Sequence, residues 1–147
     1  MKALVDVTDR TELWAESDPV RPELDVSFKT APGRGVFGLK GNKREWGAFM
    51  CYARTSAVPC DVSELTTMAD VNGSVIVPYT VWSHEKGAGR TIVNEVIEYV
   101  RSGQAGPEVR RVVTLSPQTE MARKFHIRND ATEFRLNDAT VNFEYKV

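Results

Sequence analysis

Apolar residues at alternate positions, or in short continuous runs, predict β-strands in several parts of this chain. Residues 36–40 and 46–52 are two such runs, and residues 41–43 (Gly-Asn-Lys) between them predict an antiparallel hairpin with a tight turn. Residues 74–82 hold a dense series of β-branched and aromatic side chains, which predicts a core strand. Other strands are expected at residues 4–7, 24–28 and 110–115, with a terminal hairpin from residues 133–136 and 140–145.

The predicted core strand contains a proline, Pro78. Because proline has no N–H to donate, it is confined to edges and bulges of a sheet. We therefore expect the ladder to be interrupted near Pro78 or Tyr79, with part of this strand left unpaired.

Helical periodicity is strongest over residues 90–101, where the apolar side chains fall on one side. Shorter helices are expected over residues 10–16, from residue 62, and from residue 117 to residue 126. The first of these rests on Asp9 and Glu12, which have the spacing of a capping box, and Pro117 suits the first turn of the last. This order of elements predicts a mixed sheet with helices on its faces.

The composition is that of an ordinary globular protein, with 41% hydrophobic and 27% charged residues in a chain of 147. It excludes collagen-like, coiled-coil and disordered chains, and the length fits a single domain over residues 1–147. The formal net charge is -1, which disfavours a dedicated nucleic-acid binder, because such proteins carry a basic excess. The sequence suggests no metal site.

No apolar run is long enough to cross a membrane, so no membrane partner is expected. Asp6 falls too early for the apolar region of a signal peptide. These features predict a cytoplasmic protein, and in that reducing compartment Cys51 and Cys60 are expected to be free thiols.

The segment from residue 83 to residue 91 joins the core strand to the long helix. A glycine-containing turn at a helix start leaves backbone N–H groups unpaired, and the helix dipole makes that end positive. Gly87 and Gly89 let an anion approach the backbone, and Lys86 and Arg90 add positive charge. The segment therefore predicts a phosphate site, and a turn that binds no ligand is the alternative.

Two other phosphate motifs do not fit this loop. A Walker A loop requires Gly-Lys at its end, whereas Gly89 is followed by Arg90, and His84 stands where the first glycine belongs. A Rossmann loop requires a third glycine at the position of Ile92.

The loop and a later segment resemble motifs of the GNAT superfamily of N-acetyltransferases. Residues 84–89 (His-Glu-Lys-Gly-Ala-Gly) are similar to the family's pyrophosphate loop, Arg/Gln-x-x-Gly-x-Gly/Ala. Residues 116–131 resemble the family's helix with Asn-x-x-Ala-x-x-Leu-Tyr followed by Gly-Phe, with Thr119 in the Asn place and His126 in the Tyr place. Asp130-Ala131 replaces the Gly-Phe. The short chain also resembles the compact GNAT-like proteins of tailed bacteriophages.

The resemblance implies an α+β, GNAT-like fold: a mixed, mostly antiparallel sheet with helices on both faces and two parallel strands that splay apart. It implies that acetyl-CoA is a co-substrate and lies between those strands. By resemblance, the residues expected to bind the coenzyme are Tyr79, Thr80, Val81, Trp82, His84, Lys86, Gly87, Ala88, Gly89, Arg90, Thr91 and Thr119. His126 is expected to be catalytic and to protonate the departing thiolate, and a histidine packed in the core is the alternative.

The resemblance therefore implies an enzyme that moves an acetyl group to a small-molecule or protein amine by direct attack. The alternative is a non-catalytic binding or structural protein with the GNAT fold, phage-encoded in the compact form. Glu45 and Glu144 are candidates for a general base, and the alternative is that both are solvated surface carboxylates with no catalytic role. The sequence does not decide the oligomeric state, and a homodimer is compatible with it.

Overall fold

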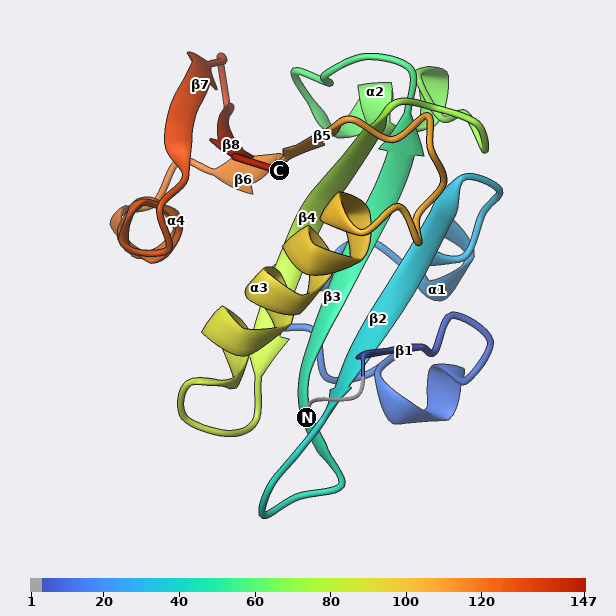
Figure 1. Cartoon of the computed structure of the whole chain (residues 1–147), viewed down its shortest axis with the longest axis vertical. Helices are drawn as coiled ribbons and strands as arrows, with labels where there is room; N and C mark the ends of the chain where they lie inside the picture. The colour runs from blue at the N-terminus through green and yellow to red at the C-terminus, as the bar shows by residue number, and fades with distance from the viewer. Residues whose placement is uncertain (1–3) are drawn as a thin grey trace.

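A computed structural model describes residues 4–147 as a central sheet with helices on its two faces (Figure 1). The strands are β1 (Leu4–Asp6), β2 (Arg34–Lys40), β3 (Trp46–Thr55), β4 (Val75–Ser83), β5 (Arg111–Val113), β6 (Ser116–Pro117), β7 (Thr132–Leu136) and β8 (Thr140–Tyr145). The helices are η1, a 3₁₀ turn (Thr11–Leu13), α1 (Val26–Lys29), α2 (Val62–Thr67), α3 (Ala88–Arg101) and α4 (Glu120–Arg128).

The eight strands form one sheet in the order β1-β2-β3-β4-β5-β8-β6, and β7 pairs with β8. Every pairing between described strands is antiparallel except that of β4 with β5. This arrangement confirms the predicted class of fold, a mixed and mostly antiparallel sheet.

Each face of the sheet carries its own hydrophobic core, because most strands are buried on both sides. On one face, α3 packs its apolar stripe, including Ile92 and Val96, against side chains of β2–β4 such as Phe37 and Met50. On the other face, Trp14 and Leu65 lie in a second cluster with Phe49 and other residues of β3 and β4. The predicted helix at residues 90–101 is confirmed, with its start at Ala88.

The ladder between β3 and β4 is interrupted where the proline predicts. Thr80 pairs with Cys51 and Pro78 pairs with Tyr52, so the register shifts and Tyr79 is skipped. This agrees with the missing N–H of proline.

On its other edge β4 pairs with β5 at two positions only, Val75 with Arg111 and Ile76 with Val112. One more backbone hydrogen bond follows, from the amide of Leu115 to the carbonyl of Pro78 at 3.0 Å. Beyond it, β4 pairs with no other strand on this edge within residues 4–147, so the two parallel strands separate.

Three local predictions are wrong, and in each a capping or packing interaction decides the outcome. Residues 10–16 form only the 3₁₀ turn η1, with no side-chain cap, because buried Trp14 donates to the carbonyl of Val7 at 2.8 Å and ends the turn. Residues 24–28 are not a strand: the Asp25 carboxylate accepts from the amide of Phe28 and starts helix α1.

The third wrong prediction concerns the start of α4. Pro117 lies in β6, opposite Thr140, instead of in a helix. The helix begins at Glu120, where the hydroxyl of Thr119 accepts from the amide of Ala122 at 3.2 Å. By contrast, the helix expected from residue 62 is confirmed as α2, and the Asp61 carboxylate caps it by accepting from the amide of Glu64.

Candidate functional site

A cavity of about 250 Å³ lies at the end where β4 separates from its parallel neighbour. We call this cavity the slot. Its lining residues are Val20, Val81, Trp82, Ser83, Gly89, Pro117, Thr119, Met121, Ala122 and Phe125. They come from β4, from the start of α3, from α4 and the residue before it, from β6 and from the segment before α1, and none of these side chains is titratable. The slot is therefore suited to a long, uncharged ligand segment.

One end of the slot lies at the start of α3. Gly87 occupies the N-cap position with φ of 82°, and no side chain caps the helix. The amides of Gly89 and Arg90 have no hydrogen-bond partner among residues 4–147. A Cβ on Gly89 would lie 3.4 Å from the ring of Phe125 in the opposite wall. The slot thus leads to unpaired N–H donors at a positive helix end.

The loop before α3 is held by the turn of the β2–β3 hairpin. The Glu85 carboxylate accepts from three successive amides, those of Asn42 (3.0 Å), Lys43 (2.9 Å) and Arg44 (2.6 Å). In addition, the amide of His84 donates to the carbonyl of Gly47 at 2.8 Å. Glu85 is therefore engaged with the hairpin, and its negative charge is met by backbone donors.

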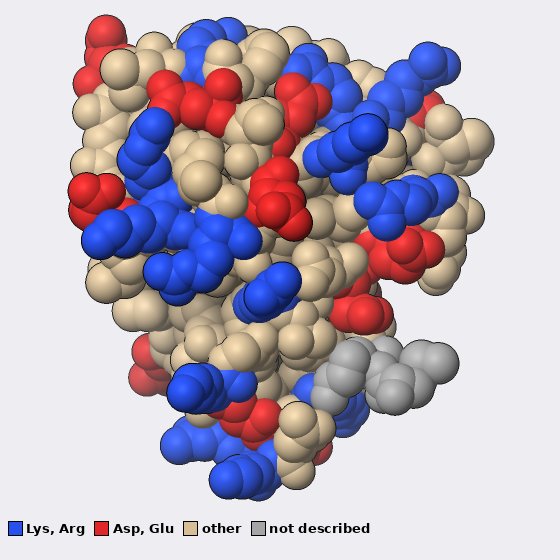
Figure 2. Space-filling view, turned by 60° about the vertical axis from the view of Figure 1, so that its left-hand side comes forward, with Lys and Arg blue, Asp and Glu red and all other residues tan. Residues whose placement is uncertain are grey.

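Positive charge gathers near this loop. Figure 2 shows a group of Lys and Arg side chains at its lower end, where Figure 1 places the β2–β3 turn and the β4–α3 loop. Those segments contain the exposed residues Lys43, Arg44 and Lys86, and Arg90 is exposed on the first turn of α3. A phosphate at the start of α3 would meet a favourable potential.

The structure brings part of the predicted coenzyme set to the slot. Val81, Trp82, Gly89 and Thr119 line it. The ring of His84 instead contacts Phe49 edge-on, with centroids 5.9 Å apart. The remaining loop residues surround the helix start without lining the slot: Lys86, Gly87 and Arg90 are exposed and Ala88 is buried. The Thr91 hydroxyl donates to the Gly87 carbonyl.

Tyr79 and Thr80 do not line the slot, because residues 14–29 cover them. We call this segment the strap. The Tyr79 carbonyl, expected to face the coenzyme, accepts from Nε of Arg21 at 3.1 Å. The Thr80 hydroxyl donates to Asp18 at 2.8 Å. Strap side chains thus occupy the Tyr79 carbonyl and the Thr80 hydroxyl, which disfavours a contact of these two groups with the coenzyme. That Tyr79 and Thr80 contact the coenzyme stays a prediction.

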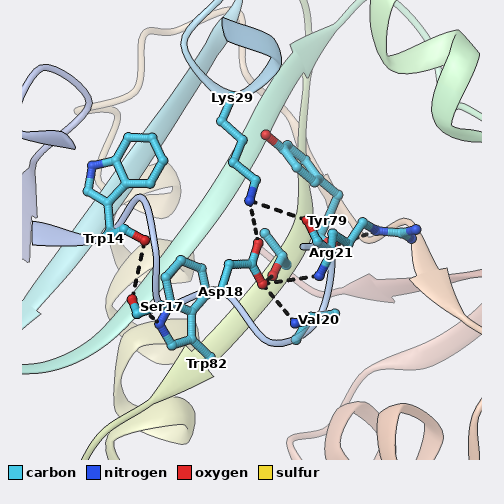
Figure 3. Close-up of polar contacts among 9 residues, drawn as sticks. Trp14, Ser17, Asp18, Val20, Arg21, Lys29, Tyr79 and Trp82 are labelled. Atoms are coloured by element: carbon cyan, nitrogen blue, oxygen red, sulfur yellow. Dashed lines mark hydrogen bonds and ion pairs between the residues drawn. The ribbon is translucent and has the colours of Figure 1, made fainter. Parts of the chain in front are cut away.

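The strap is held by a buried ion pair (Figure 3). Nζ of Lys29 lies 2.8 Å from Oδ2 of Asp18, and the two side chains are 3% and 1% exposed. Oδ1 of Asp18 also accepts from the amides of Val20 and Arg21. Burial acts to raise the pKa of Asp18, but these hydrogen bonds together outweigh it and hold that pKa below its ordinary value.

His126 lies outside the slot, on the side of α4 that faces β8. Its Nδ1 is 2.6 Å from the hydroxyl of Tyr145, and its ring stacks on Phe143 with centroids 5.2 Å apart. Burial lowers its pKa to about 4, so the ring is neutral at pH 7. This is the environment of a core histidine, and the structure gives the predicted catalytic role no support.

The other candidate groups do not line the slot either. Glu144 forms a two-point ion pair with Arg111, at 2.9 and 2.8 Å, and Glu45 is exposed beside the hairpin turn. Cys51 and Cys60 are free thiols, and burial raises the pKa of Cys51. Within residues 4–147 there is no group of three metal-ligating side chains, and no helix is long and apolar enough to span a membrane.

Sequence reasoning missed the slot residues on α4 other than Thr119. Ala122 and Phe125 follow Thr119 at intervals of three, so a shared helix face was available as a signal. Val20 gave no such signal, because it reaches the slot only through the contacts of the strap with distant strands.

Comparison with known proteins adds the class of fold. No family model matches the sequence, and no curated protein matches it. Among solved structures, the chain is similar to the loading GNATL domain of CurA from Lyngbya majuscula, with a TM-score of 0.69 and 13% identity over 99% of this chain and 98% of that one. It is also similar to the N-acetyltransferase PseH of Campylobacter jejuni, with a TM-score of 0.62 and 13% identity over 99% and 97% of the chains.

A malonyl-CoA decarboxylase from Cupriavidus metallidurans has a TM-score of 0.66 and 13% identity. The chain spans 61% of that protein, and 39% and 34% of two other malonyl-CoA decarboxylases. Together these similarities show that the chain has the GNAT fold. The expected likeness to compact phage proteins stays a prediction, since none of these neighbours is named as a phage protein.

Proposed function

We propose that the chain binds an acyl-CoA in the slot and transfers its acyl group to a small-molecule or protein amine. The observation that carries this proposal is the apolar slot itself, which opens where β4 and β5 separate and ends at the unpaired amides of α3. The pantetheine arm would lie against Val81 and Trp82, and the pyrophosphate would meet the amides of Gly89 and Arg90. PseH, a structural neighbour, has been solved with acetyl coenzyme A.

In the proposed reaction, the amine nitrogen attacks the thioester carbonyl carbon and the C–S bond breaks. The amine loses a proton, and CoA leaves as its thiolate, which takes up a proton. Because no titratable side chain lines the slot, the amine arrives neutral and both protons exchange with solvent. The chain then contributes binding and orientation rather than acid–base catalysis.

Isothermal titration with acetyl-CoA tests the coenzyme site. Gly89→Glu should abolish binding, because it places a side chain against Phe125 and a negative charge where the pyrophosphate belongs. Gln104→Glu, which adds the same charge just beyond the far end of α3, serves as the control and should bind normally. Equal binding by wild type and Gly89→Glu would place the ligand elsewhere.

A second candidate function is acyl-CoA binding without catalysis, as part of a larger assembly. The absence of titratable groups among the slot residues and the buried position of His126 favour it. Release of CoA thiol across a panel of amines separates the two functions. Binding without thiol release from any amine would favour the second function.

A further inference from the structure

The strand separation leaves two backbone carbonyls on facing segments, Tyr79 O in β4 and Leu115 O just after β5. In a parallel ladder the carbonyls of one strand that face its neighbour accept from N–H groups of that neighbour. Both residues are buried, at 2% and 0% exposure, so neither carbonyl would be satisfied by bulk solvent. A donor is needed between the two segments.

The guanidinium of Arg21 is that donor. Its Nε donates to Tyr79 O at 3.1 Å, and its Nη2 donates to Leu115 O at 3.0 Å. The two donors belong to one planar group, so they fix both carbonyls at once. Arg21 itself is only 8% exposed.

The strap places this guanidinium with precision. The Asp18 carboxylate accepts from the backbone amide of Arg21 at 3.1 Å, and Nζ of Lys29 donates to the backbone carbonyl of Arg21 at 3.3 Å (Figure 3). Asp18 and Lys29 compensate each other's charge, which leaves the buried charge of Arg21 without a directly bonded carboxylate. Burial accordingly lowers the pKa of Arg21. Burying a guanidinium without a bonded carboxylate lowers the stability of the fold, so its presence is better explained by the position in which it holds the two carbonyls.

We propose that Arg21 is a positioning residue that holds the two strand segments apart and so shapes the acyl end of the slot. Val20, next to Arg21, lines the slot, as does Pro117, two residues after Leu115. The loop that would hold the pyrophosphate begins after Ser83, four residues or about 13 Å along β4 from Tyr79. Arg21 therefore affects the acyl group and leaves the nucleotide end intact. This inference rests on the proposed acyl-CoA site.

The test compares acetyl-CoA with CoA, because only the acyl end differs. Arg21→Met keeps much of the side-chain volume but removes both donors. We expect it to weaken acetyl-CoA binding about tenfold and CoA binding much less, as measured by isothermal titration. Arg54→Met is the control: Arg54 also donates to two backbone carbonyls, those of Gly73 and Ala105, and pairs with Glu108, but it lies away from the slot. It should leave the ratio of the two affinities unchanged.

Arg21→Lys provides a second variant should Arg21→Met fail to fold. It keeps the charge but donates from one nitrogen, so we expect an intermediate change in the acetyl-CoA to CoA ratio. If wild type binds neither ligand, the proposed function is wrong. If wild type binds both and the ratio is unchanged in Arg21→Lys and in folded Arg21→Met, Arg21 does not position the acyl end, and the proposed function stands.

Discussion

The two walls of the slot are held in different ways. The β4 wall is backed by the strap, whose Asp18, Arg21 and Lys29 are charged and almost fully buried. The α4 wall is a helix of nine residues, held by a threonine cap, a neutral His126–Tyr145 hydrogen bond, aromatic contacts and a partly exposed ion pair of Arg123 with Glu133. Removing one partner of a buried ion pair costs several kcal/mol of stability, about 3–5, because it leaves the other charge uncompensated. Removing a cap or a neutral hydrogen bond costs less, about 1 kcal/mol. We therefore expect single substitutions behind β4 to cost more stability than single substitutions behind α4.

The largest effect is expected for the ion pair behind β4. Lys29→Met leaves the Asp18 carboxylate buried without its cation, which should lower the free energy of unfolding by about 3–5 kcal/mol. Urea unfolding followed by tryptophan fluorescence measures it. Adding Asp18→Asn in the same chain should restore part of the loss, because it removes the uncompensated charge. A loss below about 1 kcal/mol in the single variant would show that the pair does not secure this wall.

The next effect concerns His126 behind α4. Its pKa of about 4 in the folded protein lies below the ordinary 6.5, so the unfolded chain takes up a proton first as the pH falls. Stability should therefore be lost as the pH drops from about 6.5 towards 4, by about 3 kcal/mol at the lower end.

His126→Asn tests this pH dependence, since the amide oxygen can stay near the position of Nδ1 and accept from Tyr145 without titrating. The variant should show a flatter curve of unfolding free energy against pH between 4 and 6.5. Its acyl transfer should be unchanged, because His126 does not line the slot. A selective fall in the rate at unchanged stability would instead support the catalytic role that the sequence predicts.

A smaller effect is expected at the start of α4. Thr119→Ala removes the hydroxyl that accepts from the amide of Ala122, and should cost about 1 kcal/mol of stability. Thr119→Ser keeps the cap and should lose little. Equal stabilities of the two variants in thermal unfolding would mean that this cap does not hold the wall.

The smallest effect is expected at the end of α4. Asp130 has φ of 74°, a left-handed conformation that glycine adopts with less strain. Asp130→Gly should therefore raise the stability by about 0.5 kcal/mol, seen as a small increase in Tm. A lower Tm would indicate that the Asp130 side chain contributes more than the strain costs.

Much of the scaffold could be predicted from the sequence. The hairpin of β2 and β3, the core strand β4, helix α3 and the terminal hairpin all follow from periodicity, and Pro78 marked the break in the ladder. The glycine loop before α3 was predicted for the same reason: its properties depend on residues adjacent in the chain. Asp130 shows the limit, because the structure gives it a left-handed backbone conformation that an aspartate in the sequence does not signal.

The sequence by itself therefore determined most of the elements, the class of fold and the glycine-containing loop at the start of α3. Only the tertiary structure decided what lies behind the β4 wall of the slot, because Arg21 meets Tyr79 across 58 residues and Leu115 across 94. It also decided that His126 turns towards Tyr145, since the rotation of a short helix about its axis is set by what packs on it. Local periodicity encodes neither contact, because both depend on segments that meet only when the sheet has formed.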